Sequence, residues 1–233
     1  LRVDVLPSRV TRGRADALPV VTGGSEAGLT VAVGGDTLSR YTVDVHESRG
    51  FLVAGERGTG RTSVLLHLLE QLVERDEGVL VVTPRRSALR SAAERLDVPR
   101  FADGDLDVDD DGFLATLDRA TDRAREHGTA RAVLLCDDAE LVNATRLGER
   151  LLQVKDRLVV CAAVTASATG GFSGLDVEAK RSQRGILLNP TARAQGIFGG
   201  FLGGVLVASR PPGGGVWFED GRYELVQAVF PGL

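Results

Sequence analysis

The sequence predicts an α/β fold with a mostly parallel β-sheet and helices on both of its faces. Four short segments are apolar throughout, and each leads into a segment whose leucines or alanines recur at helical spacing. Fully apolar strands that alternate with amphipathic helices are typical of a parallel sheet covered on both sides. The composition, 43% hydrophobic and 26% charged, is that of a globular domain with a sizeable core. We therefore expect one domain over residues 1–233, with a lead-in at 1–26 and a core at 27–233.

The individual elements follow from local patterns. Residues 1–26 mix Pro, Gly and charge, and have room for one short strand. The β-rich segments 29–33 and 41–45 flank two glycines and an aspartate, which predicts an N-terminal β-hairpin. The expected strand and helix pairs are 51–54 with 62–74, 78–84 with 85–96, 131–138 with 139–154, and 157–164 with 174–183.

Three further elements complete the expected fold. Phe113, Leu117, Ala120 and Ala124 line one face of an additional helix. Residues 186–190 are one more strand. Residues 216–230 predict a C-terminal β-hairpin, because Asp220-Gly221 suits a type I′ turn.

Composition excludes several classes of protein. No run approaches the ~18 apolar residues of a membrane span, and the N-terminus lacks the apolar segment of a signal peptide. With 28 basic and 32 acidic residues, the net charge of −4 disfavours a nucleic-acid binder. Cys136 and Cys161 lie in apolar runs and are expected to be buried, reduced thiols in a cytosolic setting. The chain begins at Leu1 and has no Met, so we expect it to be part of a longer polypeptide.

A glycine-rich segment, GERGTGRT, stands between the apolar strand 51–54 and a helix. It fits the P-loop pattern G-x-x-x-x-G-K-[ST] except at the lysine. Glycines let backbone N–H groups turn inward around a phosphate, and the following helix directs its positive end at the same anion. The expected ligands are ATP and Mg²⁺, with Thr62 on the metal. The candidate nucleotide-binding residues are Gly55, Gly58, Thr59, Gly60, Arg61, Thr62 and Ser63.

The lysine of this pattern is replaced by Arg61. Lysine offers a compact charge between the β- and γ-phosphates, whereas a planar guanidinium cannot occupy that slot without shifting. Lysine is rare throughout the chain: only Lys155 and Lys180 are present among the 28 basic residues. The substitution is thus compatible with compositional drift, and the alternative to a phosphate site is a glycine-rich turn that binds nothing.

The second candidate element is an acidic pair that ends an apolar strand, in the sequence AVLLCDDAE. In P-loop proteins an aspartate here holds Mg²⁺ and the next acid orients the attacking water. Asp137 fits the metal role, and Asp138 and Glu140 are the candidate catalytic acids. Asp138 is one methylene shorter than glutamate, and a misplacement of ~1 Å can cost on the order of 100-fold in rate. Helix N-capping is the alternative reading of these acids.

From about Leu18 onward the chain resembles the FtsK/SpoIIIE family of P-loop ATPases, with their RecA/FtsK-like fold. It is most similar to the C-terminal ATPase modules of the type VII secretion motors EccC and EssC. The resemblance rests on FLVAGERGTGRTS, VVTPRRSALR, LLCDDAEL, RSQRGILLNP and RPPGGGVWFEDGRYELVQAVFP. The first and third segments are shared by P-loop proteins in general, and the last two are more specific to the terminal modules.

The chain departs from this family at three places besides Arg61. The family's Pro-Gly-Arg-Gly turn reads Pro212-Gly213-Gly214-Gly215 here, so its arginine is missing. The family's Thr-Gln-Arg-Pro run after the acidic pair is replaced by VTASATGG, in which Thr165 is the candidate sensor of a γ-phosphate. Asp138 stands where the family often has glutamate. These changes predict weak or absent hydrolysis with nucleotide binding retained.

The resemblance also implies partners. Such modules lie in tandem with other ATPase modules, behind a membrane-anchored part of the same chain, which implies a cytoplasmic domain of a membrane-associated protein. A terminal module can receive the C-terminal signal peptide of a secreted helical-hairpin WXG-type substrate. The nearest candidate for a docking patch is residues 196–207, with Ile197, Phe198, Phe201 and Leu202. Packing of these residues beneath a glycine-rich loop is the alternative.

Two functions therefore remain open. The first is a degenerate nucleotide-binding module that regulates a type VII secretion motor or docks its substrate. The second is an active Mg-ATP-hydrolysing translocase domain, for secretion or for FtsK-like DNA translocation. The absence of a basic winged-helix segment disfavours direct DNA binding. Weaker candidates are a calcium-loop spacing at residues 107–118 and arginine fingers at Arg181 and Arg184, each with a simpler role at a helix end.

Overall fold

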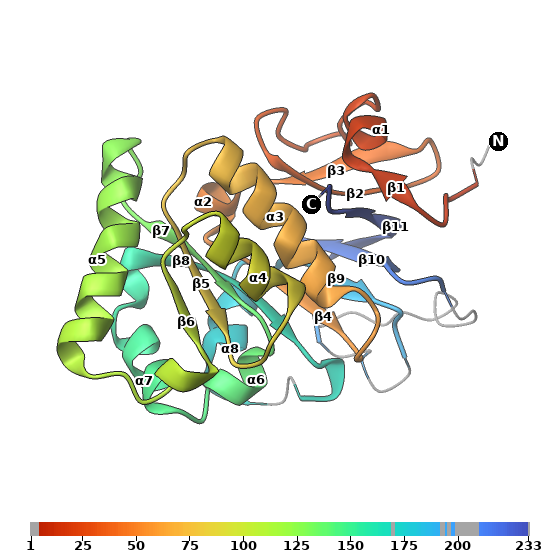
Figure 1. The fold of residues 1–233 in the computed structure, drawn as a ribbon. Helices are drawn as coiled ribbons and strands as arrows, with labels where there is room; N and C mark the ends of the chain where they lie inside the picture. Colours follow the sequence, from red (N-terminus) through yellow and green to blue (C-terminus); the bar gives the residue numbers. More distant parts are fainter. Residues whose placement is uncertain (1–4, 169–170, 192–193, 195–196, 199–209, 233) are drawn as a thin grey trace.

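The computed structural model describes residues 5–168, 171–191, 194, 197–198 and 210–232. Within these residues, eleven strands form one sheet with ten of them in the order β3-β2-β11-β10-β9-β4-β8-β7-β5-β6, while β1 pairs with β11 (Figure 1). The parallel strands are β4 (Gly50–Gly55), β5 (Val79–Thr83), β6 (Arg100–Ala102), β7 (Ala132–Cys136), β8 (Leu158–Val164) and β9 (Arg184–Leu188). This confirms the expected α/β fold with a mostly parallel sheet.

The predicted N- and C-terminal hairpins extend this sheet in antiparallel fashion. They consist of β2 (Leu29–Gly34) with β3 (Ser39–Val43), and β10 (Gly214–Glu219) with β11 (Arg222–Phe230). Asp220 and Gly221 have φ values of 47° and 79°, as the predicted type I′ turn requires. The sequence did not predict that β11 pairs with β2 and β10 with β9, which joins both hairpins to the parallel strands.

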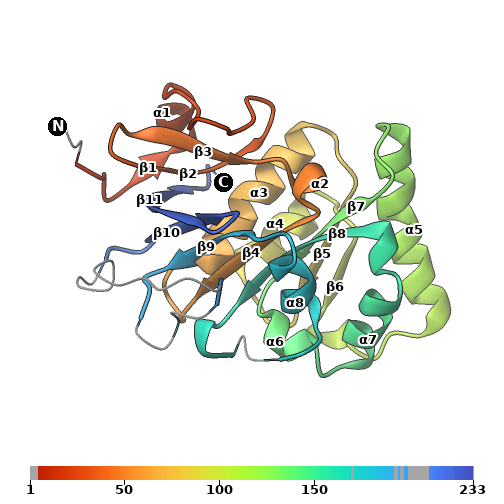
Figure 2. The same ribbon diagram turned by 180° about the vertical axis from the view of Figure 1, so that it is seen from behind.

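Helices cover both faces of the sheet. On one face, α2 (Val45–Ser48), α3 (Arg61–Glu74) and α4 (Ala88–Arg95) enclose a buried apolar cluster. On the other face, a second cluster lies beneath α5 (Asp110–Glu126), α6 (Ala139–Val142), α7 (Arg146–Gln153) and α8 (Leu175–Lys180). Figures 1 and 2 show the two faces in turn. This arrangement buries the strands on both sides, which explains their continuous apolar sequences.

The expected single helix over 139–154 is two helices, which corrects the sequence prediction. Thr145 interrupts it, because its hydroxyl accepts a hydrogen bond from the Gly148 N–H at 3.2 Å and caps α7. Gly148 also lies so near the end of α6 that a Cβ there would be 2.2 Å from the Val142 carbonyl oxygen. The periodic leucines of α7 conceal this break in the sequence.

The lead-in is ordered against the last strand. The described part of residues 1–26 contains β1 (Val10–Thr11) and α1 (Arg12–Asp16), and β1 runs parallel to β11. The remaining short elements are the 3₁₀ turns Asp103–Asp105, Lys155–Arg157 and Ala166–Ala168. Among the described helices, none has the length and apolarity needed to cross a membrane.

Candidate nucleotide-binding site

The glycine-rich loop connects β4 to α3 and is held in shape from within. Thr59 donates hydrogen bonds to the Glu56 carbonyl oxygen from its hydroxyl, at 2.7 Å, and from its N–H, at 3.3 Å. Gly58 and Gly60 have φ values of 81° and 107°, a region that other residues rarely adopt. At Gly55, a Cβ would lie 2.5 Å from the Thr59 hydroxyl oxygen. The glycines are therefore required by the path of the loop.

Several backbone donors of this loop have no partner among the described residues. Among the described residues, no hydrogen bond is made by the N–H groups of Gly58, Gly60, Arg61 or Thr62. These groups lie at or just before the first turn of α3, whose N-terminus carries partial positive charge. A phosphate is the ligand that best satisfies such a set of donors. The loop thus fits the anion that its sequence pattern predicts.

Thr62 and Asp137 come together as the two predicted metal ligands. The Thr62 hydroxyl donates a hydrogen bond of 2.8 Å to Oδ2 of Asp137, across the 75 residues that separate α3 from the end of β7. Burial raises the pKa of Asp137, and the hydrogen bond from Thr62 opposes this in part. A hydroxyl and a carboxylate suit Mg²⁺, which uses few protein ligands and keeps several waters. The donor set therefore fits the ion.

Arg61 is held by the catalytic candidates rather than extended freely. Its side chain is only 8% exposed, and Nη2 lies 2.8 Å from Oδ1 of Asp138. Nη1 donates to the Thr165 hydroxyl oxygen at 3.0 Å and lies 3.7 Å from Oε1 of Glu140. The guanidinium has thus shifted away from a lysine-like role and links the glycine loop to the acids.

Asp138 and Glu140 are arranged around this guanidinium. Asp138 has a φ of 47° at the N-cap of α6, and its Oδ2 lies 3.7 Å from Nη1 of Arg85. Glu140 accepts hydrogen bonds from the Thr165 hydroxyl at 2.5 Å and the Thr165 N–H at 3.2 Å. Its buried Oε2 has no hydrogen-bond partner in the described structure. The structure therefore brings every predicted catalytic residue to one end of the sheet.

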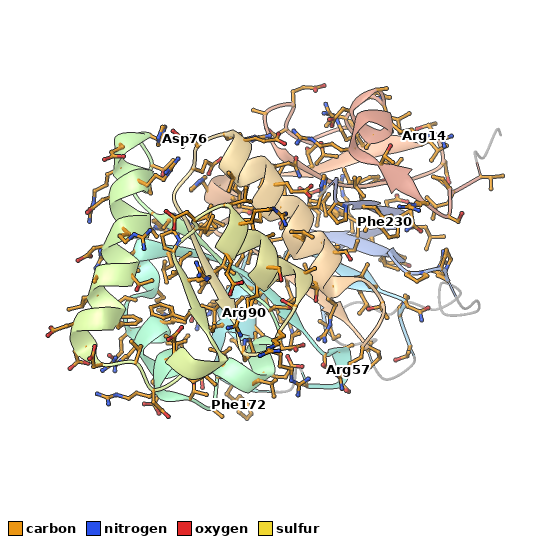
Figure 3. All side chains as sticks on the ribbon, viewed as in Figure 1. Arg14, Arg57, Asp76, Arg90, Phe172 and Phe230 are labelled. Carbon is orange, nitrogen blue, oxygen red and sulfur yellow. The ribbon has the colours of Figure 1, made fainter. Side chains whose placement is uncertain are left out.

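A cavity of about 400 Å³ opens over the glycine loop. Four arginines and two aspartates border it, which gives an excess of positive charge suited to an anionic ligand. Its lining contains Arg57, Gly58, Gly60, Arg61, Thr62, Ser63, Pro84, Arg85, Arg86, Ser87, Asp137, Asp138, Pro212 and Phe230. Figure 3 shows Arg57 on the loop that enters α3.

Sequence reasoning missed the other residues of this cavity. Arg85, Arg86 and Ser87 follow β5, a neighbour of β7 in the sheet, so the position of Pro84-Arg85-Arg86 after an apolar strand was the available signal. Pro212 and Phe230 come from the C-terminal hairpin, and no local pattern links them to the loop. An aromatic ring and a proline at the cavity edge provide an apolar surface of the kind on which a base stacks.

The Pro-Gly-Gly-Gly turn packs directly on the glycine loop. The Gly213 N–H donates to the Thr59 carbonyl oxygen at 2.8 Å, and its backbone nitrogen would lie 3.4 Å from a Cβ at Gly60. Gln227 supports the turn from below by donating to the Pro212 carbonyl oxygen at 3.0 Å. This turn, which differs from the Pro-Gly-Arg-Gly pattern of the family that the sequence resembles, is therefore part of the candidate site.

Of the candidate docking patch at residues 196–207, the structure describes Ile197 and Phe198, and for these two residues it favours the packing alternative. Ile197 is 4% exposed, and Phe198 stacks on Phe218 with ring centroids 4.4 Å apart. Both residues belong to the packed face beneath the sheet, because their apolar side chains gain more from burial there. Phe201 and Leu202 lie outside the described residues.

The weaker candidates have local roles. Asp109 of the calcium-like segment caps α5 by accepting from the Gly112 N–H at 2.7 Å. In the part of the chain that the structure describes, no group of three or more His, Cys, Asp or Glu side chains is placed to hold a metal. Arg181 pairs with Glu178 at 2.7 Å and Arg184 with Glu219 at 3.2 Å, so both arginines are engaged within their own chain.

The mostly parallel sheet and the glycine loop between β4 and α3 define a P-loop nucleoside-triphosphatase fold. Residues 45–167, more than half of the chain, match the family model described as AAA domain. The protein belongs to this AAA domain family. The matched segment runs from α2 to the turn after β8 and includes Arg61, Asp137 and Thr165. No match is found among curated proteins.

Solved structures of secretion ATPases share the fold. EssC (ATPases 2 and 3) from Geobacillus thermodenitrificans superposes with a TM-score of 0.70 at 18% identity, over 97% of this chain and 45% of that one. The cytoplasmic domain of EssC gives 0.66 at 18% identity, over 98% and 48%. Thermomonospora curvata EccC (ATPases 2 and 3), in complex with a signal sequence peptide, gives 0.66 at 19% identity, over 99% and 44%. The chain therefore spans less than half of each of these structures.

Proposed function

We propose that this protein is a nucleotide-binding ATPase module of a type VII secretion motor that binds Mg-ATP or its product with weak or no hydrolysis. The observation that carries the proposal is the pairing of Arg61 with Asp138 at 2.8 Å, next to a glycine loop in which four N–H groups have no partner among the described residues. The loop retains the features needed for binding. Asp138, an acid expected to orient the attacking water, already pairs with the Arg61 guanidinium.

Binding is supported by the loop, Thr62 and Asp137. The N–H groups of Gly58, Gly60, Arg61 and Thr62 would hold phosphate oxygens, and Thr62 and Asp137 would hold Mg²⁺. When bound, the metal neutralises phosphate charge. Asp137 is 5% exposed, so its carboxylate is costly to bury as an anion and gains from a cation beside it.

Weak hydrolysis is supported by the engagement of each catalytic candidate. Asp138 is shorter than glutamate, and its Oδ1 already pairs with Arg61, so this oxygen is not free to orient a water molecule. Thr165, the candidate γ-phosphate sensor, donates its hydroxyl to Glu140. A water-activating acid placed ~1 Å from its productive position costs on the order of 100-fold in rate.

The place of the module in a secretion motor is supported by the folds of EssC and EccC. Both proteins are longer than this chain, and the structures are described as holding ATPases 2 and 3. We propose that this chain likewise lies beside other ATPase modules of one polypeptide and reaches the membrane only through that polypeptide. Its net charge of −4 supports a role that does not involve direct DNA binding.

A thermal melt with Mg-ATP, together with a phosphate-release assay, tests this function. At a nucleotide concentration 100 times Kd, binding stabilises the native state by about 2.7 kcal/mol. For a domain of this size the midpoint rises by about 5 to 10 °C. Asp137→Ala should reduce the Mg-dependent shift of the midpoint. Asp107→Ala should not, because Asp107 is an exposed acid in the segment before α5. The absence of a shift with both millimolar Mg-ATP and millimolar Mg-ADP would refute nucleotide binding.

The active-enzyme alternative rests on Glu140. Its Oε2 is buried and has no hydrogen-bond partner among the described residues, so it can accept one from a water molecule. In this alternative Glu140, rather than Asp138, is the general base. Steady-state phosphate release that is lost in both Asp137→Ala and Glu140→Gln would establish the active enzyme and refute weak hydrolysis.

We further propose that the module docks the signal peptide of a secreted substrate. A cavity of about 580 Å³ near α8 is lined by Val177, Phe198 and Phe218, together with Lys180, Arg181 and Asp176. Apolar residues beside two cations suit an amphipathic peptide that carries acidic residues. The EccC structure bound to a signal sequence peptide supports this class of partner.

Fluorescence anisotropy with a labelled C-terminal peptide of a WXG-type substrate tests the docking. Val177→Arg would fill the cavity and should weaken binding at least tenfold. Leu114→Arg is the matched control, because Leu114 is 45% exposed on α5, away from the cavity. Equal affinities for both variants would refute docking at this cavity.

A further inference from the structure

The guanidinium of Arg61 is fixed by three side chains at one end of the nucleotide cavity. It pairs with Asp138 at 2.8 Å, donates to Thr165 at 3.0 Å and lies 3.7 Å from Glu140. Its side chain is 8% exposed, so this charge cluster is largely shielded from water. A shielded ion pair with an added hydrogen bond is costly to separate.

The two parts of the cavity differ in which groups remain free. In P-loop proteins backbone N–H groups hold the α- and β-phosphates, and the lysine reaches the β- and γ-phosphates. Here the N–H groups of Gly58, Gly60, Arg61 and Thr62 have no partner among the described residues, and the Thr62 hydroxyl bonds to its expected metal partner, Asp137. The residues expected to meet a third phosphate, Arg61 and Thr165, already bond to acids.

We propose that Arg61 makes this cavity selective for nucleoside diphosphates over triphosphates. The inference rests on the proposed nucleotide binding and specifies its ligand class. A diphosphate uses the free N–H groups and leaves the pair of Arg61 with Asp138 intact. A triphosphate must either separate that pair or bring its last phosphate near Asp138 and Glu140 without a free cation from Arg61.

The surrounding charges strengthen this selection. Asp138 also lies 3.7 Å from Arg85, whose side chain is half exposed, so Arg85 compensates the acid from the solvent side. Together, Arg61 and Arg85 neutralise Asp138 and Glu140. A third phosphate that drew Arg61 away would leave the part-buried carboxylate of Glu140 without this cation and Asp138 with Arg85 alone, which carries a desolvation cost.

Isothermal titration of the 233-residue chain with Mg-ADP and with a non-hydrolysable ATP analogue tests the inference. We expect the wild-type chain to bind ADP at least tenfold more tightly than the triphosphate. Arg61→Lys should tighten triphosphate binding about tenfold and change ADP binding less than threefold, because a lysine ammonium is compact and mobile. Arg119→Lys is the matched control, since Arg119 is 60% exposed on α5, and it should leave both affinities unchanged.

A second variant tests the role of the Arg61 interactions in this selectivity. Thr165→Val removes one hydrogen bond to Arg61 and should reduce the preference for ADP to a value between those of wild type and Arg61→Lys. Equal wild-type affinities for both nucleotides, or an unchanged ratio in folded Arg61→Lys, would overturn the selectivity while leaving nucleotide binding established. Failure of both nucleotides to bind would overturn the proposed function as well.

Discussion

Replacement of Gln71 by leucine should destabilise the domain, because this side chain completes the edge of β2. β11 pairs with β2 at Ala32, Val33 and Gly34 but does not reach Thr30. Gln71 of α3 takes the place of the missing strand: its Oε1 accepts from the Thr30 N–H at 2.8 Å and its Nε2 donates to the Thr30 carbonyl oxygen at 2.8 Å. Gln71 is 1% exposed, so water cannot replace these bonds without rearrangement.

The magnitude follows from the two backbone groups that would lose their partners. Each buried, unsatisfied group costs about 1 to 3 kcal/mol, and the gain from burying an apolar leucine offsets part of this. We expect the free energy of unfolding to fall by about 2 to 4 kcal/mol, a large share of the ~5 to 15 kcal/mol of a typical domain. For a chain of this length, the thermal midpoint should fall by about 5 to 15 °C.

Urea unfolding of wild type, Gln71→Leu and Gln71→Glu, followed by circular dichroism, measures this effect. Gln71→Glu keeps the acceptor for the Thr30 N–H and loses the donor, and it also buries a new carboxyl group, so its stability should likewise be reduced. Gln153→Leu makes the same change at an exposed position of α7 and should alter stability by less than ~0.5 kcal/mol. A Gln71→Leu variant within ~0.5 kcal/mol of wild type would show that the side chain is not needed to satisfy Thr30.

Three other predictions concern the loop, pH and thiols. Gly60→Ala should lower nucleotide protection in a thermal melt and cost about 1 to 2 kcal/mol, because φ is 107° and Gly213 lies close; an unchanged melt would contradict this. Burial lowers the pKa of His67, so below pH ~6.5 the unfolded chain binds a proton more readily than the folded one. The free energy of unfolding should be constant above pH ~7 and fall below ~6.5, by up to ~1.4 kcal/mol per pH unit. His67→Gln should reduce this slope in urea titrations. Burial raises the pKa of Cys161 to about 12, so this thiol and Cys136 should react with a disulfide reagent only after unfolding, and labelling of the native protein would contradict their burial.

The sequence predicted those parts of the fold that local patterns determine. Apolar segments became β4, β5, β7 and β8, because strands buried on both faces need no alternation. The short strand β6 was missed, since Arg100, Phe101 and Ala102 form no distinct pattern. The pairing of β11 with β2 depends on residues nearly 200 positions apart, which no local signal records.

The candidate site was predictable to a similar extent. Glycine spacing located the loop, and the acidic pair after a strand located Asp137 and Asp138, because parallel strands end at a common edge. The bonds of Arg61 to Asp138 and Thr165 could not be predicted. The direction of a long arginine side chain depends on which acids the fold brings near it. The sequence alone predicted only that the guanidinium of Arg61 cannot occupy the position of a lysine ammonium without shifting.

The C-terminal hairpin is attached to the glycine loop just before β10 and to α3 just after β11. At the start of the hairpin, the Gly213 N–H bonds to the Thr59 carbonyl oxygen at 2.8 Å. Beyond β11, the Gly232 N–H bonds to Oε2 of Glu70 on α3 at 3.0 Å. Loop, helix and hairpin are thereby coupled as one mechanical unit. A ligand that displaced Thr59 would strain its hydrogen bond to Gly213 or move the open end of the β10–β11 hairpin, so the cavity would be coupled to the segment near Gly232.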